Sequence, residues 1–168
     1  MGVEVDVVVP EIEELIGGEP HELVRQNALS KAQAVAAVAE PGSTVIAGDT
    51  EVILDGRALG QPADEAEARE MLTALSGRRH EVLGGVAVIA ADEETVGVEA
   101  SRVRFRDLPE AEIDAYVASG EWHGRAGAYA IQGLGSALVE EVKGDLSNVI
   151  GLPVALLLRL APEILNRN

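Results

Sequence analysis

The stretch from residue 43 to residue 62 constrains the fold most, because it holds two short apolar runs separated by a polar segment. The first run, Thr44 to Ala47, is bounded by turn residues and is typical of a buried strand. The second run, Val52 to Leu54, ends at Asp55-Gly56, which is a strong turn signal. Asp49 is therefore expected at or near the end of a buried strand, where open α/β sheets gather their ligands.

Two interpretations of Asp49 follow from that position. A carboxylate there can hold a metal ion or take a proton from water. An Asp followed by Thr also commonly caps a turn through its own side chain. The stretch by itself does not decide between a functional site and a capped turn.

The composition is that of one globular domain. The chain has 168 residues, enough to bury a core, and its hydrophobic content of 47% excludes disorder as the overall state. Aromatic residues make up only 2%, so the core must be built from Val, Leu, Ile and Ala. There is no cysteine, no apolar run of transmembrane length and no signal-peptide pattern at the acidic N-terminus, so we expect a cytoplasmic protein without disulfides.

The charge is strongly negative, with 29 acidic against 13 basic residues and a net charge of −16. Nucleic-acid binding needs a basic face, so this balance argues against it. The bases are arginines apart from two lysines, Lys31 and Lys143. A phosphorylated small molecule can still bind if a divalent cation and a few local bases neutralise it.

The hydrophobic patterns predict a single α/β domain with a mixed, curved sheet flanked by helices. Beyond the two runs above, strands are expected at Val3–Val9, Glu81–Ala90, Thr95–Arg106 and Ala137–Val142, and helices are expected to begin at Pro20, Asp64, Pro109 and Leu152. A phase change near Ser101 predicts a bulge. In the first helix, Lys31 shares the apolar face of Val24 and Val35, so its ammonium must reach water, an acid or a phosphate.

No familiar catalytic triad, cysteine-histidine metal site or phosphate-binding glycine motif is present. The remaining candidates are acids, one helix lysine and polar groups at turns: Glu13, Glu14, Lys31, Asp49, Thr50, Gln132, Asp145 and Ser147. Hard oxygen ligands of this kind suit Mg²⁺ or Mn²⁺, and the set fits metal-assisted hydrolysis of a phosphoanhydride. Any acidic protein can supply such a set, so spacing alone does not select this chemistry.

Several sequence blocks, in order along the chain, are more specific. They are Val9-Pro10 with Glu13-Glu14, KAQAV at Lys31 to Val35, AGDTEVILDGRALGQP at Ala47 to Pro62, AREMLTALSGRRHEV at Ala68 to Val82, AGAYAIQGLG at Ala126 to Gly135 and GDLSNVIGLP at Gly144 to Pro153. Together they cover nearly the whole chain, which resembles the Maf family of nucleoside triphosphate pyrophosphatases. The resemblance implies a Maf-like α/β fold and hydrolysis of a nucleoside triphosphate to the monophosphate and pyrophosphate.

The resemblance also implies roles for single residues. Asp49 matches the family's catalytic acid, the proton acceptor for the attacking water. Thr50 and Gln132 match positions linked to nucleotide selectivity, and Lys31 matches a lysine near the phosphates. The GAYAIQG segment is similar to the branch that prefers dTTP and UTP, which implies a house-cleaning role in nucleotide metabolism.

A divalent cation, Mg²⁺ or Mn²⁺, is part of the same implication. Asp49 and either Glu13 or Glu14 match the acids that hold it, and the sequence does not distinguish the two glutamates. A homodimer is expected by analogy with the family, and neither nucleic acid nor membrane is expected as a partner.

Two departures from the family pattern bear on activity. The usual SxSPRR loop, which supplies a serine and arginines to the triphosphate, is missing, and the usual GKP is Gly60-Gln61-Pro62. Gln61 thus puts a neutral amide where a charged phosphate contact is expected. We expect residues 1–168 to form one Maf-like domain that is N-terminally shortened, either by a start codon assigned too late or by a true loss. The alternative function is a non-catalytic nucleotide-binding or regulatory protein related to septum formation.

Overall fold

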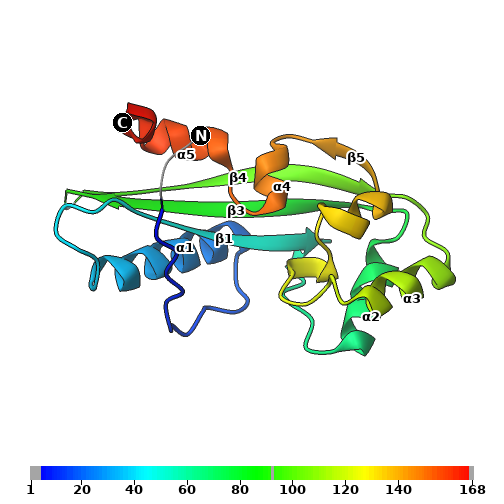
Figure 1. Ribbon diagram of the computed structural model, residues 1–168. Helices are drawn as coiled ribbons and strands as arrows, with labels where there is room; N and C mark the ends of the chain where they lie inside the picture. Colours follow the sequence, from blue (N-terminus) through cyan, green and yellow to red (C-terminus); the bar gives the residue numbers. More distant parts are fainter. Residues whose placement is uncertain (1–4, 92, 167–168) are drawn as a thin grey trace.

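The computed structural model, which describes residues 5–91 and 93–166, has one sheet with helices on both faces (Figure 1). The strands are β1 (Val45–Leu54), β2 (Arg57–Ala58), β3 (Arg79–Ala90), β4 (Glu93–Phe105) and β5 (Val139–Lys143), in the spatial order β2-β1-β3-β4-β5. The α-helices are α1 (Pro20–Ala36), α2 (Glu65–Leu75), α3 (Glu110–Ser119), α4 (Leu146–Ile150) and α5 (Val154–Leu160), with 3₁₀ turns η1 (Ala126–Ala128), η2 (Gly133–Leu138) and η3 (Pro162–Asn166). The predicted α/β class is confirmed.

The strand pairings differ in direction from the expected mixed sheet. Every pairing among the described strands is antiparallel. The reason is local connection: β1 and β2 are joined by the predicted Asp55-Gly56 turn, and β3 and β4 are separated by only two residues. Both turn residues have positive φ, 51° and 77°, as a two-residue hairpin turn requires.

β1 runs without interruption through Gly48, Asp49 and Thr50, so the predicted strand end at this point is wrong. The two apolar runs are one strand, because the intervening residues also pair with β3. Asp49 therefore lies in the middle of a strand, which rules out the turn-capping interpretation.

Two other local predictions are wrong. The expected strand at Val3–Val9 begins outside the described residues, and its described part forms no strand. Val7 and Val9 are each 85% exposed, and within the described residues this segment pairs with no strand, so its alternating pattern alone does not form one. The expected bulge near Ser101 is found instead between Arg104 and Phe105, where the pairing of β4 with β5 shifts register.

Two glycines in β3 let helices approach both faces of the sheet (Figure 1). A Cβ on Gly85 would meet the backbone of Val24 in α1, and a Cβ on Gly84 would meet the side chain of Asn148 in α4. Adjacent strand residues face opposite sides, so α1 covers one face and α4 the other. Gly84 and Gly85 pair with the middle of β1, so both helices contact the sheet next to that part of β1.

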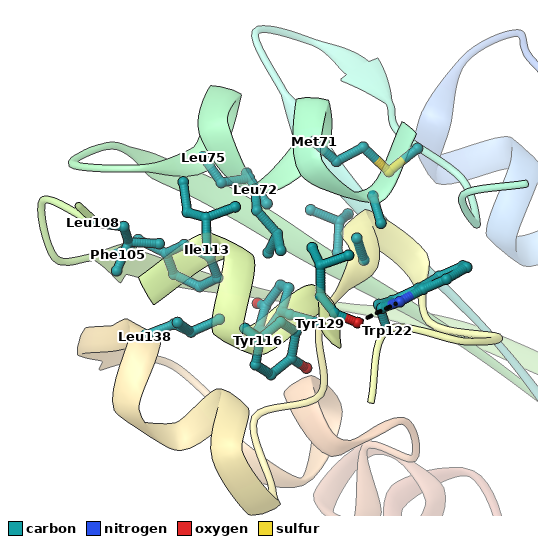
Figure 2. Packing of buried hydrophobic residues seen from close by; sticks show 14 of the residues in the cluster. Met71, Leu72, Leu75, Phe105, Leu108, Ile113, Tyr116, Trp122, Tyr129 and Leu138 are labelled. Atoms are coloured by element: carbon teal, nitrogen blue, oxygen red, sulfur yellow. Dashed lines mark hydrogen bonds between the residues drawn. The ribbon is translucent and has the colours of Figure 1, made fainter. Parts of the chain in front are cut away.

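The largest apolar cluster lies at one end of the sheet, under α2 and α3 (Figures 1 and 2). The predicted stripe of α2 is buried there, and Asp64 caps this helix by accepting a hydrogen bond from the Glu67 amide. Phe105 and Tyr129 pack edge to face with centroids 4.8 Å apart. In the part of the chain that the structure describes, no helix is long and apolar enough to span a membrane.

His80 lies within this cluster and makes stability depend on pH. Its side chain is 3% exposed, its Nε2 is 2.9 Å from the Tyr129 hydroxyl, and burial lowers its pKa to about 4. Unfolding restores the ordinary pKa near 6.5, so the unfolded state binds more protons below about pH 6.5. The stabilisation is therefore present above about pH 6.5 and is lost as the pH falls toward 4.

We expect the free energy of unfolding to fall by about 2 kcal/mol from this group alone between about pH 7 and about pH 5. Urea denaturation at a series of pH values measures it, with His80→Phe as the comparison. The variant should lose this part of the pH dependence, even if it is less stable at pH 7. Parallel pH profiles for the two proteins would contradict the assignment.

Candidate active site

A cavity of about 470 Å³ opens beside the middle of β1. Its walls come from the segment before α1, from α1 itself, from the turn after β2, from the loop around η1 and from the end of α4. It brings together six of the residues predicted from the sequence: Glu14, Lys31, Asp49, Thr50, Gln61 and Gln132. These residues are far apart in the chain, so the fold and not local sequence creates the cluster.

Asp49 is the most enclosed acid of the cavity, with its side chain 7% exposed. It lies opposite Gly85 of β3, whose missing side chain lets α1 come near. One carboxylate oxygen accepts a hydrogen bond from Lys31 Nζ at 2.6 Å, and the other accepts one from Asn27 Nδ2 at 3.3 Å. Both donors come from α1, so this helix orients the carboxylate from the face of the sheet that it covers.

Lys31 bridges two acids. Its Nζ lies 2.6 Å from Asp49 Oδ1 and 3.0 Å from Glu14 Oε1, and its side chain is 20% exposed. Burial disfavours the charged form, but the hydrogen bonds to the two carboxylates outweigh it and raise the pKa of Lys31. Of the three partners left open for this ammonium, water, an acid or a phosphate, the structure shows acids.

The structure separates the two candidate glutamates. Glu14 lines the cavity and pairs with Lys31. Glu13 is exposed, is not among the cavity residues, and forms no ion pair within the described part of the chain. Of the two, only Glu14 is placed to act together with Asp49.

Thr50 faces the opposite side of the strand from Asp49. Its hydroxyl donates to the carbonyl of Gly151 at 3.4 Å, next to the end of α4. Gln132 follows η1 and is exposed at the cavity wall. The cavity thus has Asp49 and Lys31 on the α1 face of β1 and Thr50 on the α4 face, with Gln132 and Arg125 also in its wall.

The loop with Gln132 and the turn with Gln61 are held to each other. The amide of Gly127 donates to the carbonyl of Gly60 at 2.8 Å. A second bond, from the amide of Ala130 to the Tyr116 hydroxyl at 3.2 Å, holds the loop to α3. Gly60 has φ +66°, a conformation that suits glycine. Gln61 itself is exposed at the cavity wall, where the family pattern has a lysine.

Asp145 and Ser147, two of the sequence candidates, do not line this cavity. Asp145 caps α4 by accepting hydrogen bonds from the amide and hydroxyl of Ser147, which lower its pKa. The Ser147 hydroxyl in turn accepts from the amide of Val154. Their local hydrogen bonds explain both residues as supports of the α4–α5 connection.

Glu51 is a cavity residue that the sequence reasoning missed. It lies two residues after Asp49 and therefore on the same side of β1. Its carboxylate accepts a hydrogen bond from the amide of Gly60 at 3.2 Å, while burial and the charge of Asp49 raise its pKa. Strand alternation would have found it, had the segment around Asp49 been predicted as strand.

Asn27 is the second missed residue. Its side chain is 2% exposed and forms three hydrogen bonds: it accepts from the amide of Leu15 at 2.9 Å and donates to the carbonyl of Leu15 at 3.1 Å and to Asp49. It therefore ties the segment that contains Glu14 to the strand that contains Asp49. Its spacing of four residues from Lys31 on one helix was the available signal.

Because Asp49 is the expected catalytic acid, we expect Asn27→Leu to lower turnover by about 10- to 100-fold, the usual effect of losing a residue that orients a metal-binding or catalytic carboxylate. Leucine has a similar size but leaves the Leu15 peptide and Asp49 without their partner. Steady-state kinetics of purified variants measure the effect. Gln26→Ala, on an exposed part of the same helix, is the matched control and should stay near wild type. Equal kinetics for Asn27→Leu and wild type would contradict the positioning role.

Two carboxylates of the cavity fit a divalent cation. Glu14 and Asp49 lie close enough to share one ammonium, and their oxygens are the ligands that Mg²⁺ and Mn²⁺ prefer. Within residues 5–91 and 93–166, no three His, Cys, Asp or Glu side chains are grouped as a metal site. Mg²⁺ commonly takes one or two protein carboxylates and completes its shell with water and phosphate oxygens, so this pair suits an ion shared with a phosphorylated ligand.

Comparison with known proteins agrees with the sequence blocks. A family model described as Maf-like protein matches residues 1–164. The dTTP/UTP pyrophosphatase of Symbiobacterium thermophilum is 48% identical over 156 residues, which cover 92% of this chain and 80% of that protein. The dTTP/UTP pyrophosphatase of Bacillus cereus strain AH820 is 48% identical over 162 residues, with 94% and 83% covered. On these matches, the chain belongs to the Maf family.

Proposed function

We propose that this protein is a nucleoside triphosphate pyrophosphatase that prefers dTTP and UTP. The observation that supports it most is the cavity in which Asp49, enclosed between Lys31 and Asn27, shares one space with Thr50 and Gln132. Such a site offers a carboxylate, a cation and neutral hydrogen-bonding groups within one space. The activity printed in the names of two relatives that are each 48% identical points to the same chemistry.

In this proposal, the two sides of the cavity divide the substrate between them. The triphosphate lies on the α1 face, where Lys31 attracts it, and the base and sugar lie toward Thr50 and Gln132. Asp49 accepts the proton of the water that attacks the α-phosphorus, and pyrophosphate is the leaving group. Asn27 keeps the carboxylate oriented while it does so.

A divalent cation held by Glu14 and Asp49 would neutralise phosphate charge and make the phosphorus easier to attack. Two basic side chains of the cavity, Lys31 and Arg125, would neutralise the remaining negative charge of the triphosphate. Gln61 contributes a neutral amide, which we expect to bind phosphate more weakly than a lysine would.

The test is release of pyrophosphate from a panel of ribo- and deoxyribonucleoside triphosphates with Mg²⁺ or Mn²⁺. We expect metal-dependent formation of the monophosphate and pyrophosphate in equal amounts, fastest with dTTP and UTP. Orthophosphate as the first product would place the cleavage at the wrong bond. The same rate for all bases would contradict the selectivity that we assign to Thr50 and Gln132.

A non-catalytic nucleotide-binding or regulatory role is the second candidate, and Gln61 in place of a lysine favours it. In that case, a folded protein binds nucleotide, measured by calorimetry, but releases no pyrophosphate with any metal. Gln61→Lys then helps to separate the two functions. A gain of turnover in this variant would identify an enzyme weakened at its phosphate site, while tighter binding without turnover would favour the binding role.

A further inference from the structure

The ammonium of Lys31 lies between the two acids Glu14 and Asp49, where a metal cation could also bind. Its single Nζ lies 2.6 Å from Asp49 Oδ1 and 3.0 Å from Glu14 Oε1, and these acids come from separate segments of the chain. No other base forms an ion pair with either acid within the described residues. Among the described basic side chains, the Lys31 ammonium is thus the one that contacts both carboxylates, while Asn27 links Asp49 to the backbone next to Glu14.

We propose that Lys31 is an exchangeable occupant of the cation position, and that a divalent cation and the Lys31 ammonium exclude each other between Glu14 and Asp49. The inference rests on the proposed function, because it assigns the order of events at that site. When the cation is absent, Lys31 offsets one of the two negative charges and keeps the acids close. When the cation binds, it displaces the ammonium into the cavity.

Charge and geometry support the exclusion. An ammonium and a divalent ion at hydrogen-bonding or coordination distance from the same two oxygens would repel each other, most strongly at the enclosed carboxylate of Asp49. The lysine stem has four rotatable methylene groups, so its head can move without any change in α1. Glu14, in a segment without helix or strand, is 48% exposed in its side chain and can also adjust.

The exchange couples metal binding to phosphate binding. A lysine paired with two carboxylates has no free charge for a substrate, whereas a displaced ammonium does. The Lys31 ammonium is then available to a triphosphate only when the divalent cation is bound between Glu14 and Asp49. Substrate without metal should therefore bind weakly, although Lys31 is present.

The first test measures Mn²⁺ binding by calorimetry without nucleotide. Removing the competing ammonium in Lys31→Met should tighten Mn²⁺ binding by about tenfold relative to wild type, because two unpaired acids then face the ion. The same variant should lose pyrophosphate release, so affinity for metal and turnover change in opposite directions. Unchanged or weaker Mn²⁺ binding by Lys31→Met would overturn the proposal, as would no detectable binding by either protein.

Two variants control for charge and site. Lys143→Met removes a positive charge outside the cavity, where Lys143 pairs with Glu141 at 3.2 Å, and should leave Mn²⁺ affinity unchanged. The double variant Lys31→Met with Asp49→Asn should lose the gain in affinity. Equal tightening in Lys143→Met would mean that net charge alone is responsible, which contradicts the exchange.

A second test uses the wild-type protein and so does not depend on how the variants fold. The chain has only two lysines, so acetic anhydride labelling read by peptide mass spectrometry compares Lys31 directly with Lys143. Saturating Mn²⁺ should speed the labelling of Lys31 severalfold and leave Lys143 unchanged, because a displaced amine is more exposed to the reagent. Slower or equal labelling of Lys31 would overturn the proposal. The calorimetry and the labelling contain no nucleotide, so a failure of the pyrophosphatase proposal is a separate result, seen only in the product assay.

Discussion

Asp49→Asn should lower kcat/KM for pyrophosphate release by about a thousandfold, within the range expected when a general base is removed. The amide keeps the size of the side chain and can still accept a hydrogen bond from Lys31, but it cannot take a proton from water at neutral pH. Its position within β1 should be kept, because the strand is held by its pairing with β3. The loss should therefore fall on kcat and not on folding.

Asp55→Asn is the matched control for this substitution. Asp55 lies on the same hairpin, pairs with Arg78 at 2.6 Å and is exposed, and its φ of 51° is one that asparagine tolerates. We expect wild-type kinetics from it. If Asp49→Asn retained more than about a tenth of the wild-type kcat with an unchanged melting temperature, a base other than Asp49 would have to be sought, and Glu51 would be the first to examine.

Local sequence patterns predicted the helices better than the site. Apolar spacing and the Asp64 cap were sufficient for α1 and α2, because each depends on residues within a few positions of one another. The segment around Asp49 failed the same approach. Its Gly-Asp-Thr run has turn residues, and only the pairing with β3 makes it a strand.

That error explains why Glu51 was missed. A carboxylate two residues after Asp49 in a strand lies on the same face as Asp49. In a turn, the same spacing does not predict on which side the second carboxylate lies. The choice between Glu13 and Glu14 failed for another reason. Both lie in a segment without regular structure, so no period could say which one faces Lys31.

For Asn27, the sequence offered only the spacing of four residues from Lys31, which does not reveal its partners. Its three hydrogen bonds reach Leu15 and Asp49, which lie 12 and 22 residues away along the chain. An asparagine in a helix is ordinarily a weak helix former with an exposed side chain, and only the close approach of α1 to β3 makes it a buried link. Asp49 and Lys31, by contrast, were already candidates from the strand and helix patterns, and the family blocks point to the same two residues.

The approach of α1 to β3 is itself testable at Gly85. A Cβ at this position would lie 2.7 Å from the carbonyl carbon of Val24 and closer still to its oxygen, which is backbone and cannot rotate away. Gly85→Ala should therefore push α1 from the sheet and lower the free energy of unfolding by about 3 kcal/mol, the upper part of the range for overpacked cores. Because α1 bears Asn27 and Lys31, turnover should fall in the fraction that remains folded.

Gly48→Ala separates this steric effect from a general cost of replacing glycine in the sheet. Gly48 lies on the neighbouring strand, and its added Cβ would meet its nearest neighbours at 3.4 to 3.9 Å, which is close to ordinary contact. Its free energy of unfolding in urea should stay within about 1 kcal/mol of wild type. If Gly85→Ala proved as stable as Gly48→Ala, α1 would not be seated on β3 at this glycine. The geometry that places Lys31 and Asn27 on Asp49 would then need another support.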